Sequence, residues 1–255
     1  MSIRYYKLIA CNVFMREISI AIAESSHVVD PEFTEVGDHV HSDRLRELIQ
    51  TRIDAAATAS RDYDAVLLAY GLCGNAAVGL IARDTPLVIP RAHDCCTLLL
   101  GSRQAFDTHF AAHPSRPFSS AGTMDRGEYY LRRDDEGTHI HYGDGYAELV
   151  REYGRENADY IWETMHPPAL REIEQHAVFI DIPETSHLGH RDRFARKTAE
   201  QGKTALQLTG DLRLLRGLLQ ENWSAEEYLV VPPGYRTVGR YDAVQVIDCE
   251  PAGSA

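Results

Sequence analysis

The chain has 255 residues, of which 44% are apolar and 25% charged, a balance typical of a globular protein with a sizeable core. Acidic residues outnumber Lys and Arg by 38 to 26, giving a formal net charge of −12. This charge argues against nucleic-acid binding, which needs a basic face. No apolar run is long enough for a membrane span, and the start of the chain lacks the features of a signal peptide. We therefore expect a cytoplasmic protein with no membrane or nucleic-acid partner.

The five cysteines lie at positions 11, 73, 95, 96 and 249. Their number is odd, they are widely scattered, and a chain of this length needs no cross-links for stability. We expect all five thiols to be reduced.

In the first half of the chain, short apolar runs alternate with amphipathic stretches, as expected for parallel strands joined by helices. Strands are predicted at residues 6–11, within 28–40, at 65–70 and at 86–89. Helices are predicted after a cap at Ser42, over 76–83 and over 95–110. Together these elements would form an N-terminal α/β lobe, residues 1–115.

The middle of the chain, residues 116–169, is predicted to connect two lobes. From about residue 114 to 145 the sequence is richer in Gly, Pro and charge. Two strands, 128–132 and 138–142, would form a hairpin. A long helix over 146–165 would end at the two prolines that follow it.

A second alternating series predicts a C-terminal lobe, residues 170–255. Strands are predicted at residues 177–182, 204–209, 228–231 and 244–247. Helices would begin near Asp192 and Asp211. The predicted fold class is therefore α/β, with two Rossmann-like lobes, parallel sheets and a central cleft. One continuous doubly wound sheet is the alternative.

Three cysteines fall where an open parallel sheet binds its ligands, beyond the carboxyl ends of the strands. Cys11 ends the first predicted strand, Cys73 follows the strand at 65–70, and Cys95 follows the strand at 86–89. Each loop leads into a predicted helix, whose amino terminus favours the thiolate that binds metals or attacks substrates. We expect the three sulfur atoms to lie within one coordination sphere.

The expected metal is zinc, because thiolate-rich sites suit it, and iron or an iron-sulfur cluster is the second choice. The chain has no local C-x-x-C pair of the kind that structural zinc sites use. The sequence therefore favours an open site that the fold assembles.

The alternative reading is that these cysteines are small buried hydrophobic residues. We adopt it for Cys96 and Cys249. It is weaker for Cys73, because two glycines flank it and permit close approach of the backbone. Whether Cys95 or Cys96 faces the site stays open.

Three further residues near strand ends are candidates for catalysis. Arg91 would bind an anionic substrate across the cleft. His93 would act as a metal ligand or hydrogen-bond a substrate. Asp211 would be a helix cap, a catalytic acid, or both.

The loop that carries Gly71, Gly74 and Asn75 is a candidate cofactor-binding segment, because amides at a helix start can hold a phosphate. A pair of histidines, His187 and His190, has a spacing that would also suit a metal, although loop histidines are more often solvated. No G-x-S-x-G, P-loop or G-x-G-x-x-G motif is present.

Several segments resemble a family of bacterial and archaeal proteins. They are residues 9–12 (IACN), 70–74 (YGLCG), 91–95 (RAHDC), 210–212 (GDL) and 232–234 (PPG). The chain resembles the domain-of-unknown-function 1638 family over nearly its whole length. This resemblance implies an association with corrinoid-dependent one-carbon metabolism, in which zinc-thiolate sites activate thiols for methyl transfer.

We therefore expect a metal-thiolate enzyme that acts on a small molecule, as a zinc- or iron-dependent transferase. The resemblance adds methyl or one-carbon transfer as the reaction and a corrinoid protein as a partner. Two alternatives remain: a non-catalytic protein that binds a small molecule or cofactor, and a metal-free enzyme with a cysteine nucleophile.

Overall fold

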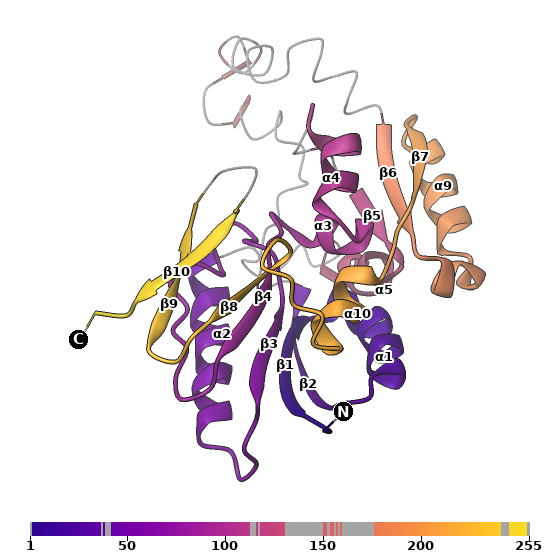
Figure 1. Cartoon of the computed structure of the whole chain (residues 1–255). Coiled ribbons are helices and arrows are strands. Elements are labelled where there is room, and N and C mark those ends of the chain that lie inside the picture. Colours follow the sequence, from indigo (N-terminus) through magenta and orange to yellow (C-terminus); the bar gives the residue numbers. More distant parts are fainter. Residues whose placement is uncertain are drawn as a thin grey trace. The chain divides into compact units, whose positions relative to one another are not determined.

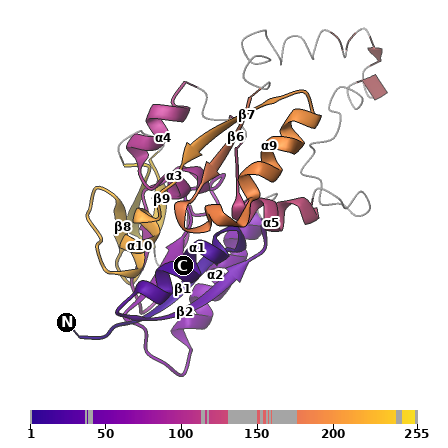
Figure 2. The ribbon, with the colours of Figure 1, turned by 90° about the vertical axis from the view of Figure 1, so that its right-hand side faces the viewer.

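The computed structural model describes residues 2–36, 38, 42–112, 116, 118–130, 150–151, 154–155, 157, 159, 176–240 and 245–253. The chain divides into two compact units, whose elements are shown from two directions in Figure 1 and Figure 2. Unit 1 combines residues 1–109 with 209–255, and unit 2 comprises residues 110–208. Among the described residues, no helix has the length and apolar character needed to cross a membrane.

Unit 1 is built on a five-stranded sheet in the order β2-β1-β3-β4-β8. The strands are β1 (Tyr5–Cys11), β2 (Val28–Thr34), β3 (Ala65–Ala69), β4 (Leu87–Pro90) and β8 (Tyr228–Val231). The first four are parallel, and β8 pairs with β4 in the antiparallel direction. The predicted α/β class is confirmed, with an antiparallel edge strand added to a parallel sheet.

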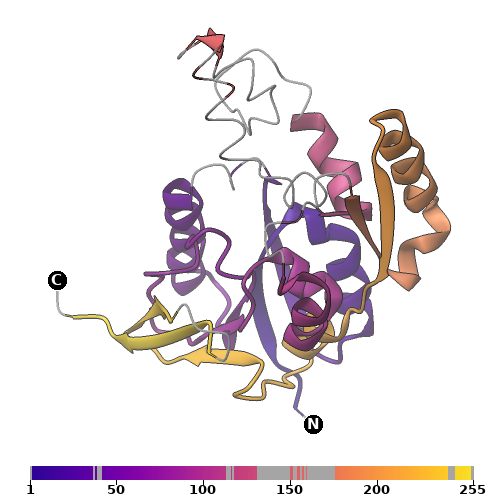
Figure 3. The same cartoon turned by 90° about the horizontal axis from the view of Figure 1, so that it is seen from above.

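Helices cover both faces of this sheet, and the central strands are correspondingly apolar. Every residue of β3 and β4 is buried, as expected for strands with both faces covered. Figure 3 shows α2 (Ser42–Ala57) on one side and α1 (Met15–Glu24) on the other, where α1 contacts α10 (Arg213–Leu219). The buried residues of α2 recur every three or four positions, which places them on one face of the helix. They are Leu45, Ile49, Ile53 and Ala56.

The remaining elements of unit 1 are helices after β1 and β4 and a C-terminal hairpin. The 3₁₀ helix η1 (Asn12–Phe14) follows β1, and α3 (Cys95–Leu100) and α4 (Arg103–Phe110) follow β4. An antiparallel hairpin of β9 (Tyr235–Gly239) and β10 (Ile247–Pro251) ends the described chain. Hydrogen bonds between β9 and residues 79–82 join this hairpin to the rest of unit 1.

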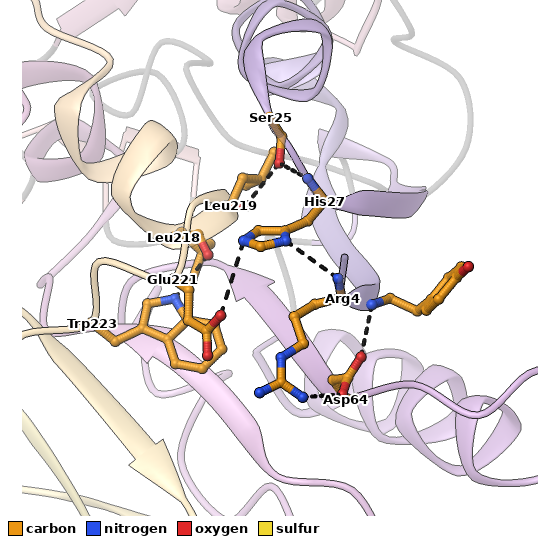
Figure 4. Close-up of polar contacts among 9 residues, drawn as sticks. Arg4, Ser25, His27, Asp64, Leu218, Leu219, Glu221 and Trp223 are labelled. Carbon is orange, nitrogen blue, oxygen red and sulfur yellow. Dashed lines mark hydrogen bonds and ion pairs between the residues drawn. The ribbon is translucent and has the colours of Figure 1, made fainter. Parts of the chain in front are cut away.

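Polar contacts at the amino ends of β1 and β3 tie the C-terminal part of unit 1 to its N-terminal strands (Figure 4). His27 accepts a hydrogen bond at Nδ1 from the Arg4 backbone N–H (3.3 Å), and its Nε2 lies 3.9 Å from a Glu221 carboxylate oxygen. Ser25 donates its hydroxyl hydrogen to the Leu219 carbonyl (3.0 Å). Asp64 accepts from the Arg4 guanidinium (2.9 Å). This end of the sheet therefore holds segments that are distant in the sequence.

Unit 2 contains a three-stranded sheet in the order β5-β6-β7, made of β5 (Phe118–Ser120), β6 (His176–Asp181) and β7 (Thr204–Thr209). Its helices are α5 (Ala121–Tyr130), η3 (Pro183–Leu188) and α9 (His190–Glu200). Figure 2 shows α9 beside β6 and β7, and the Phe179 and Phe194 rings are 5.2 Å apart at this contact. Aromatic packing between strand and helix thus forms part of the core of unit 2.

The predicted strands at 6–11, 65–70, 86–89, 177–182, 204–209 and 228–231 are confirmed to within one residue at each end. The extended piece expected within 28–40 is β2, and the last strand, expected at 244–247, instead begins at Ile247. The predicted C-terminal lobe, 170–255, is divided between the two units, because β8 joins the sheet of the N-terminal strands. The predicted central cleft stays a prediction.

The helix predicted over 76–83 is wrong, because residues 73–79 form turns instead. The helix predicted over 95–110 is two helices, divided at Gly101, whose φ of +76° ends α3. The hairpin predicted at 128–132 and 138–142 is wrong where it overlaps α5, which runs to Tyr130, and its remainder lies outside the described residues. The helix predicted over 146–165 falls largely outside them as well.

Candidate functional site

Three cysteines stand at the carboxyl ends of neighbouring strands in unit 1. Cys11 is the last residue of β1, and Cys73 lies in the loop after β3. Cys95 is the first residue of α3, the helix that follows β4. Because β1, β3 and β4 are adjacent and parallel, their carboxyl ends meet at one edge of the sheet (Figure 1).

The pKa values of Cys73 and Cys95 reflect both burial and the neighbouring thiols. Burial is the first cause that raises the pKa of the Cys95 thiol well above its usual value, and Cys73 and Cys11 both add to the rise. Burial also raises the pKa of the Cys73 thiol to about 12, with a further contribution from Cys11. The structure thus brings together three thiols that are far apart in the sequence.

The stricter expectation, a shared coordination sphere, is not met by the side-chain positions in this structure. Cys11 is buried, whereas Cys73 and Cys95 keep part of their residue surface exposed even though burial dominates the pKa of each sulfur. The described His, Cys, Asp and Glu side chains include no group of three or more arranged to hold a metal ion. Binding of one ion by all three cysteines therefore stays a prediction.

Of the two adjacent cysteines at the start of α3, Cys95 faces the other thiols. Cys73 and Cys11 both act on the pKa of Cys95. The pKa of the buried Cys96 thiol is raised by burial and by Asp94 instead. Cys95 is therefore the candidate ligand, and Cys96 fills the core.

The backbone around Cys73 adopts an unusual conformation. Cys73, Gly74 and Asn75 have φ values of +47°, +64° and +72°, so three successive residues are left-handed. Such a conformation costs on the order of 1 kcal/mol or more for each non-glycine residue, and strain of this kind gathers at functional sites. The observed strain at Cys73 supports a functional role for this loop.

The Cys73 loop is held closely against the segment that leads to Cys95. The backbone N–H of Leu72 donates to the Ala92 carbonyl (2.9 Å), and that of Cys73 donates to the His93 carbonyl (3.1 Å). A Cβ atom at Gly71 would come within 2.6 Å of the Asp94 nitrogen, so only glycine permits this approach. The two thiol-bearing segments are thereby fixed relative to each other.

Polar residues surround Cys11 at the ends of β1 and β2. The buried Asn12 donates through Nδ2 to a Glu35 carboxylate oxygen (2.6 Å), and the Asp38 carboxylate accepts from the Glu35 backbone N–H (3.0 Å). Burial raises the pKa of the Cys11 thiol to about 12, and Asp38 and Glu35 add to the rise. The backbone N–H groups of Val13 and Asn12 act in the opposite direction.

A pair of buried hydroxyl groups lies beside the thiols. The Tyr70 and Thr34 hydroxyl oxygens are 2.7 Å apart, and both side chains are buried. Burial raises the pKa of Tyr70 well above its usual value, and Cys11 and Cys73 both contribute, so the phenol belongs to the same site. The sequence analysis missed Tyr70 and Thr34, although Tyr70 directly precedes Gly71 at the end of a strand.

The charged groups that act most strongly on the three thiols are acidic. Glu35 and Asp38 act on Cys11, and Asp94 acts on both Cys73 and Cys95. Negative charge opposes formation of thiolates, so the thiols are protonated at neutral pH. A bound cation would reverse this balance, and sulfur ligands beside carboxylates suit zinc or iron. The residues present therefore fit a metal ion of that kind.

Arg91 is engaged with the backbone of the C-terminal segment. Its guanidinium donates to the carbonyls of Ala225 and Gln245, each at 2.9 Å, and to that of Ile247. These contacts hold the loop before β8 and the start of β10. The structure therefore gives Arg91 a structural task, and its catalytic role stays a prediction.

His93 and Asp94 are positioned by the loop itself. The His93 ring lies 5.9 Å from that of Phe106, and its backbone carbonyl accepts from Cys73. Asp94 caps α3 by accepting a hydrogen bond from the Thr97 backbone N–H (3.2 Å). A ligand role for His93 stays a prediction.

Asp211 lies just before α10, where its carboxylate binds the first backbone N–H of the helix. Its carboxylate accepts from the Arg213 backbone N–H (2.8 Å), and its own N–H donates to the Leu99 carbonyl (2.9 Å). It borders an open groove of about 430 Å³ that also contacts Arg213 and Glu227. None of the cysteines lines this groove, so the described structure shows no link between Asp211 and the thiol site.

Part of the backbone of the predicted phosphate-binding loop is engaged in hydrogen bonds. Two of its backbone N–H groups, those of Leu72 and Cys73, already donate to carbonyls. The Asn75 carbonyl accepts from the Arg46 guanidinium (3.1 Å). The cofactor-binding roles of Gly71, Gly74 and Asn75 stay predictions, and in this structure these residues shape the loop through the close approach at Gly71 and the left-handed backbone of the other two.

The two histidines of unit 2 do not act as a pair. His190 is buried and its Nε2 lies 2.7 Å from an Asp125 carboxylate oxygen, which joins α9 to α5. His187 is exposed on η3. The structure therefore gives no support to a metal site at this spacing.

Comparison with known proteins identifies a family and nothing more specific. Neither the curated proteins nor the solved structures include a significant match to this chain. A family model described as a protein of unknown function, DUF1638, matches residues 33–216, which include Cys73 and Cys95 but not Cys11. This match confirms the resemblance seen in the sequence, and the chain belongs to the DUF1638 family.

Proposed function

We propose that this protein is a metal-thiolate enzyme that acts on a small molecule. Cys11, Cys73 and Cys95 would hold a zinc ion, with iron as the second choice. The observation that carries the proposal is the placement of three cysteines at the carboxyl ends of the adjacent parallel strands β1, β3 and β4, beside acidic groups.

The raised pKa values favour a metal site over a free cysteine nucleophile. A catalytic cysteine needs a lowered thiol pKa so that the thiolate is present at neutral pH. Here burial and acidic neighbours raise the pKa of both Cys11 and Cys73 to about 12. Without a cation these thiols are protonated and weakly nucleophilic, whereas a divalent ion compensates the charge of three thiolates.

Three protein ligands leave a fourth position open on a tetrahedral ion, as in catalytic zinc sites. A zinc ion held in this way deprotonates a bound substrate thiol and keeps it nucleophilic at neutral pH. Cys11 is buried, while Cys73 and Cys95 are partly exposed, so a small molecule would approach from the side of the latter two.

We further propose methyl or one-carbon transfer as the reaction and a corrinoid protein as the partner, on the family resemblance alone. Reduced cysteines and the acidic charge support a cytoplasmic location without nucleic-acid binding.

Metal analysis of the purified full chain tests the metal site directly. We expect about one zinc or iron per chain, because the three thiolates would hold a single tetrahedral ion with its fourth position open. After removal of the metal, cobalt(II) should occupy the same site and give the intense absorption band of sulfur-to-cobalt charge transfer. Cys11→Ser, Cys73→Ser and Cys95→Ser should each abolish that band.

Cys249→Ser is the matched control, because Cys249 lies on β10 away from the three loops, and it should leave the band unchanged. A wild-type chain that binds neither zinc, iron nor cobalt would overturn the metal site. A chain that binds metal but transfers no methyl group between a methylated corrinoid protein and a small thiol would instead be a binding protein.

A further inference from the structure

The segment that follows Cys73 is held from the C-terminal hairpin. Residues 73–79 form turns, and Gly79 has a φ of +87°, a conformation that excludes the expected right-handed helix. Ile81 then forms a bridge with Arg236 of β9. The chain after the thiol loop therefore runs alongside β9.

Thr237 supplies most of this connection. Its hydroxyl donates to the Ala77 carbonyl (2.7 Å) and accepts from the Leu80 backbone N–H (2.9 Å). Its backbone N–H donates to the Leu80 carbonyl (2.9 Å), and its carbonyl accepts from the Gly79 N–H (2.8 Å). The residue is fully buried, so water cannot replace any of these partners.

A continuous line of hydrogen bonds leads from Thr237 into the thiol site. The Thr237 hydroxyl binds the Ala77 carbonyl, and the Ala77 N–H donates to the Leu72 carbonyl (3.3 Å). The Leu72 N–H in turn donates to the Ala92 carbonyl (2.9 Å). Cys73 lies directly after one of these linked residues, and Cys95 lies three residues beyond the last.

We infer that Thr237 is a positioning residue for the thiol site. It fixes the left-handed Cys73 loop so that Cys73 can bind the same metal ion as Cys11 and Cys95. This inference rests on the proposed function. It also extends the site beyond the family-matched residues 33–216, because Thr237 lies outside them. The hydroxyl is the working group, since an aliphatic side chain of the same shape would leave the Ala77 carbonyl and the Leu80 N–H without a partner.

Cobalt(II) titration of the full chain, followed by charge-transfer absorption, tests the inference. Thr237→Val keeps the shape and removes the hydroxyl, and we expect cobalt to bind about tenfold more weakly, with a weaker band. Thr237→Ser restores the hydroxyl and should stay within about twofold of wild type. Glu250→Gln removes an exposed ion pair with Arg236 on the same hairpin, and its titration should match wild type.

A second variant guards against a simple folding defect in Thr237→Val. Gly79→Ala strains the same contact from the other side, since alanine disfavours the φ of +87° while the nearest side-chain atom is 3.8 Å away. It should also weaken cobalt binding. Wild-type affinity in both variants, each with a wild-type circular dichroism spectrum, would overturn the inference.

Alkylation of Cys73, followed by mass spectrometry, separates this inference from the proposed function. If the wild-type chain binds no metal but Thr237→Val alkylates faster at Cys73 than wild type, the proposed function fails and the positioning role stands. If alkylation at Cys73 is also unchanged, the positioning role fails as well.

Discussion

Gly71 lies so close to Asp94 that a Cβ atom at position 71 would stand 2.6 Å from the Asp94 nitrogen and 2.7 Å from its Cα. The loop after β3 therefore touches the loop after β4 through the backbone. This contact sets the spacing between Cys73 and Cys95, and four predictions follow from it and from the surroundings of the thiols.

Gly71→Ala should push the two loops apart. We expect a loss of about 1–3 kcal/mol in the free energy of unfolding, because both neighbouring atoms belong to the backbone and yield little. Cobalt(II) affinity should fall with it, by about tenfold. Gly253→Ala is the matched control, since nothing lies within 4 Å of its added Cβ, and urea unfolding should show a change below about 0.5 kcal/mol. Equal stability in the two variants would contradict the close approach.

The stability of the metal-free chain should fall in alkaline solution. The pKa values of Cys11 and Cys73 are raised to about 12 in the folded chain, against an ordinary value of 9.0. Below pH 9 these thiols are protonated in both states, so their stabilising contribution is complete. Between pH 9 and 12 the unfolded chain loses its thiol protons first, and the contribution disappears as pH rises.

Urea unfolding at pH 8 and pH 10 would measure this alkaline loss. The double variant Cys11→Ser and Cys73→Ser should lose less stability than wild type over the same interval, because serine does not titrate there. An identical loss in both proteins would show that other groups, rather than these two thiols, cause the pH dependence.

The hydroxyl pair of Tyr70 and Thr34 should behave as a coupled unit. Tyr70→Phe or Thr34→Val alone removes the hydrogen bond between the two buried hydroxyls and should cost about 1–2 kcal/mol. The double variant should cost about 1 kcal/mol less than the sum of the two, since both hydroxyls are then gone. A double-mutant cycle by urea unfolding measures this coupling, and strict additivity would show that the 2.7 Å contact contributes nothing.

His27 should affect stability without affecting the thiols. His27→Ala removes the acceptor for the Arg4 N–H and the contact with Glu221 (Figure 4). It also removes a ring whose centroid lies 5.4 Å from that of Tyr6. We expect a loss of about 1–3 kcal/mol in the free energy of unfolding. Cobalt(II) affinity should stay within about twofold of wild type, because β1 separates this cluster from Cys11.

His187→Ala, at an exposed position of unit 2, provides the comparison for that variant and should be nearly neutral in urea unfolding. A large loss of cobalt affinity in His27→Ala would mean that the two ends of β1 are coupled. It would also remove the distinction between a stabilising end and a ligand-binding end of the sheet.

The sequence by itself determined the α/β class, the positions of six strands and the placing of Cys11, Cys73 and Cys95 at strand ends. Apolar runs such as residues 65–69 indicate a buried strand, because strands covered on both faces do not alternate between polar and apolar residues. The rule that parallel strands end at one edge of a sheet then brings distant cysteines together without knowledge of any contact.

The tertiary structure decided the direction in which strands pair and the contacts between segments that are distant in the sequence. The run Tyr228–Val231 has the same composition whether it pairs parallel or antiparallel, and only its contact with β4 makes it an antiparallel edge strand of unit 1. The segment after Cys73 has helical composition, yet Thr237 of a hairpin far along the chain holds it as turns. The partners Tyr70 and Thr34 and the contacts of Arg91 likewise arise between distant segments. Local sequence cannot specify such contacts, because each depends on the register and return path of a segment that lies elsewhere in the chain.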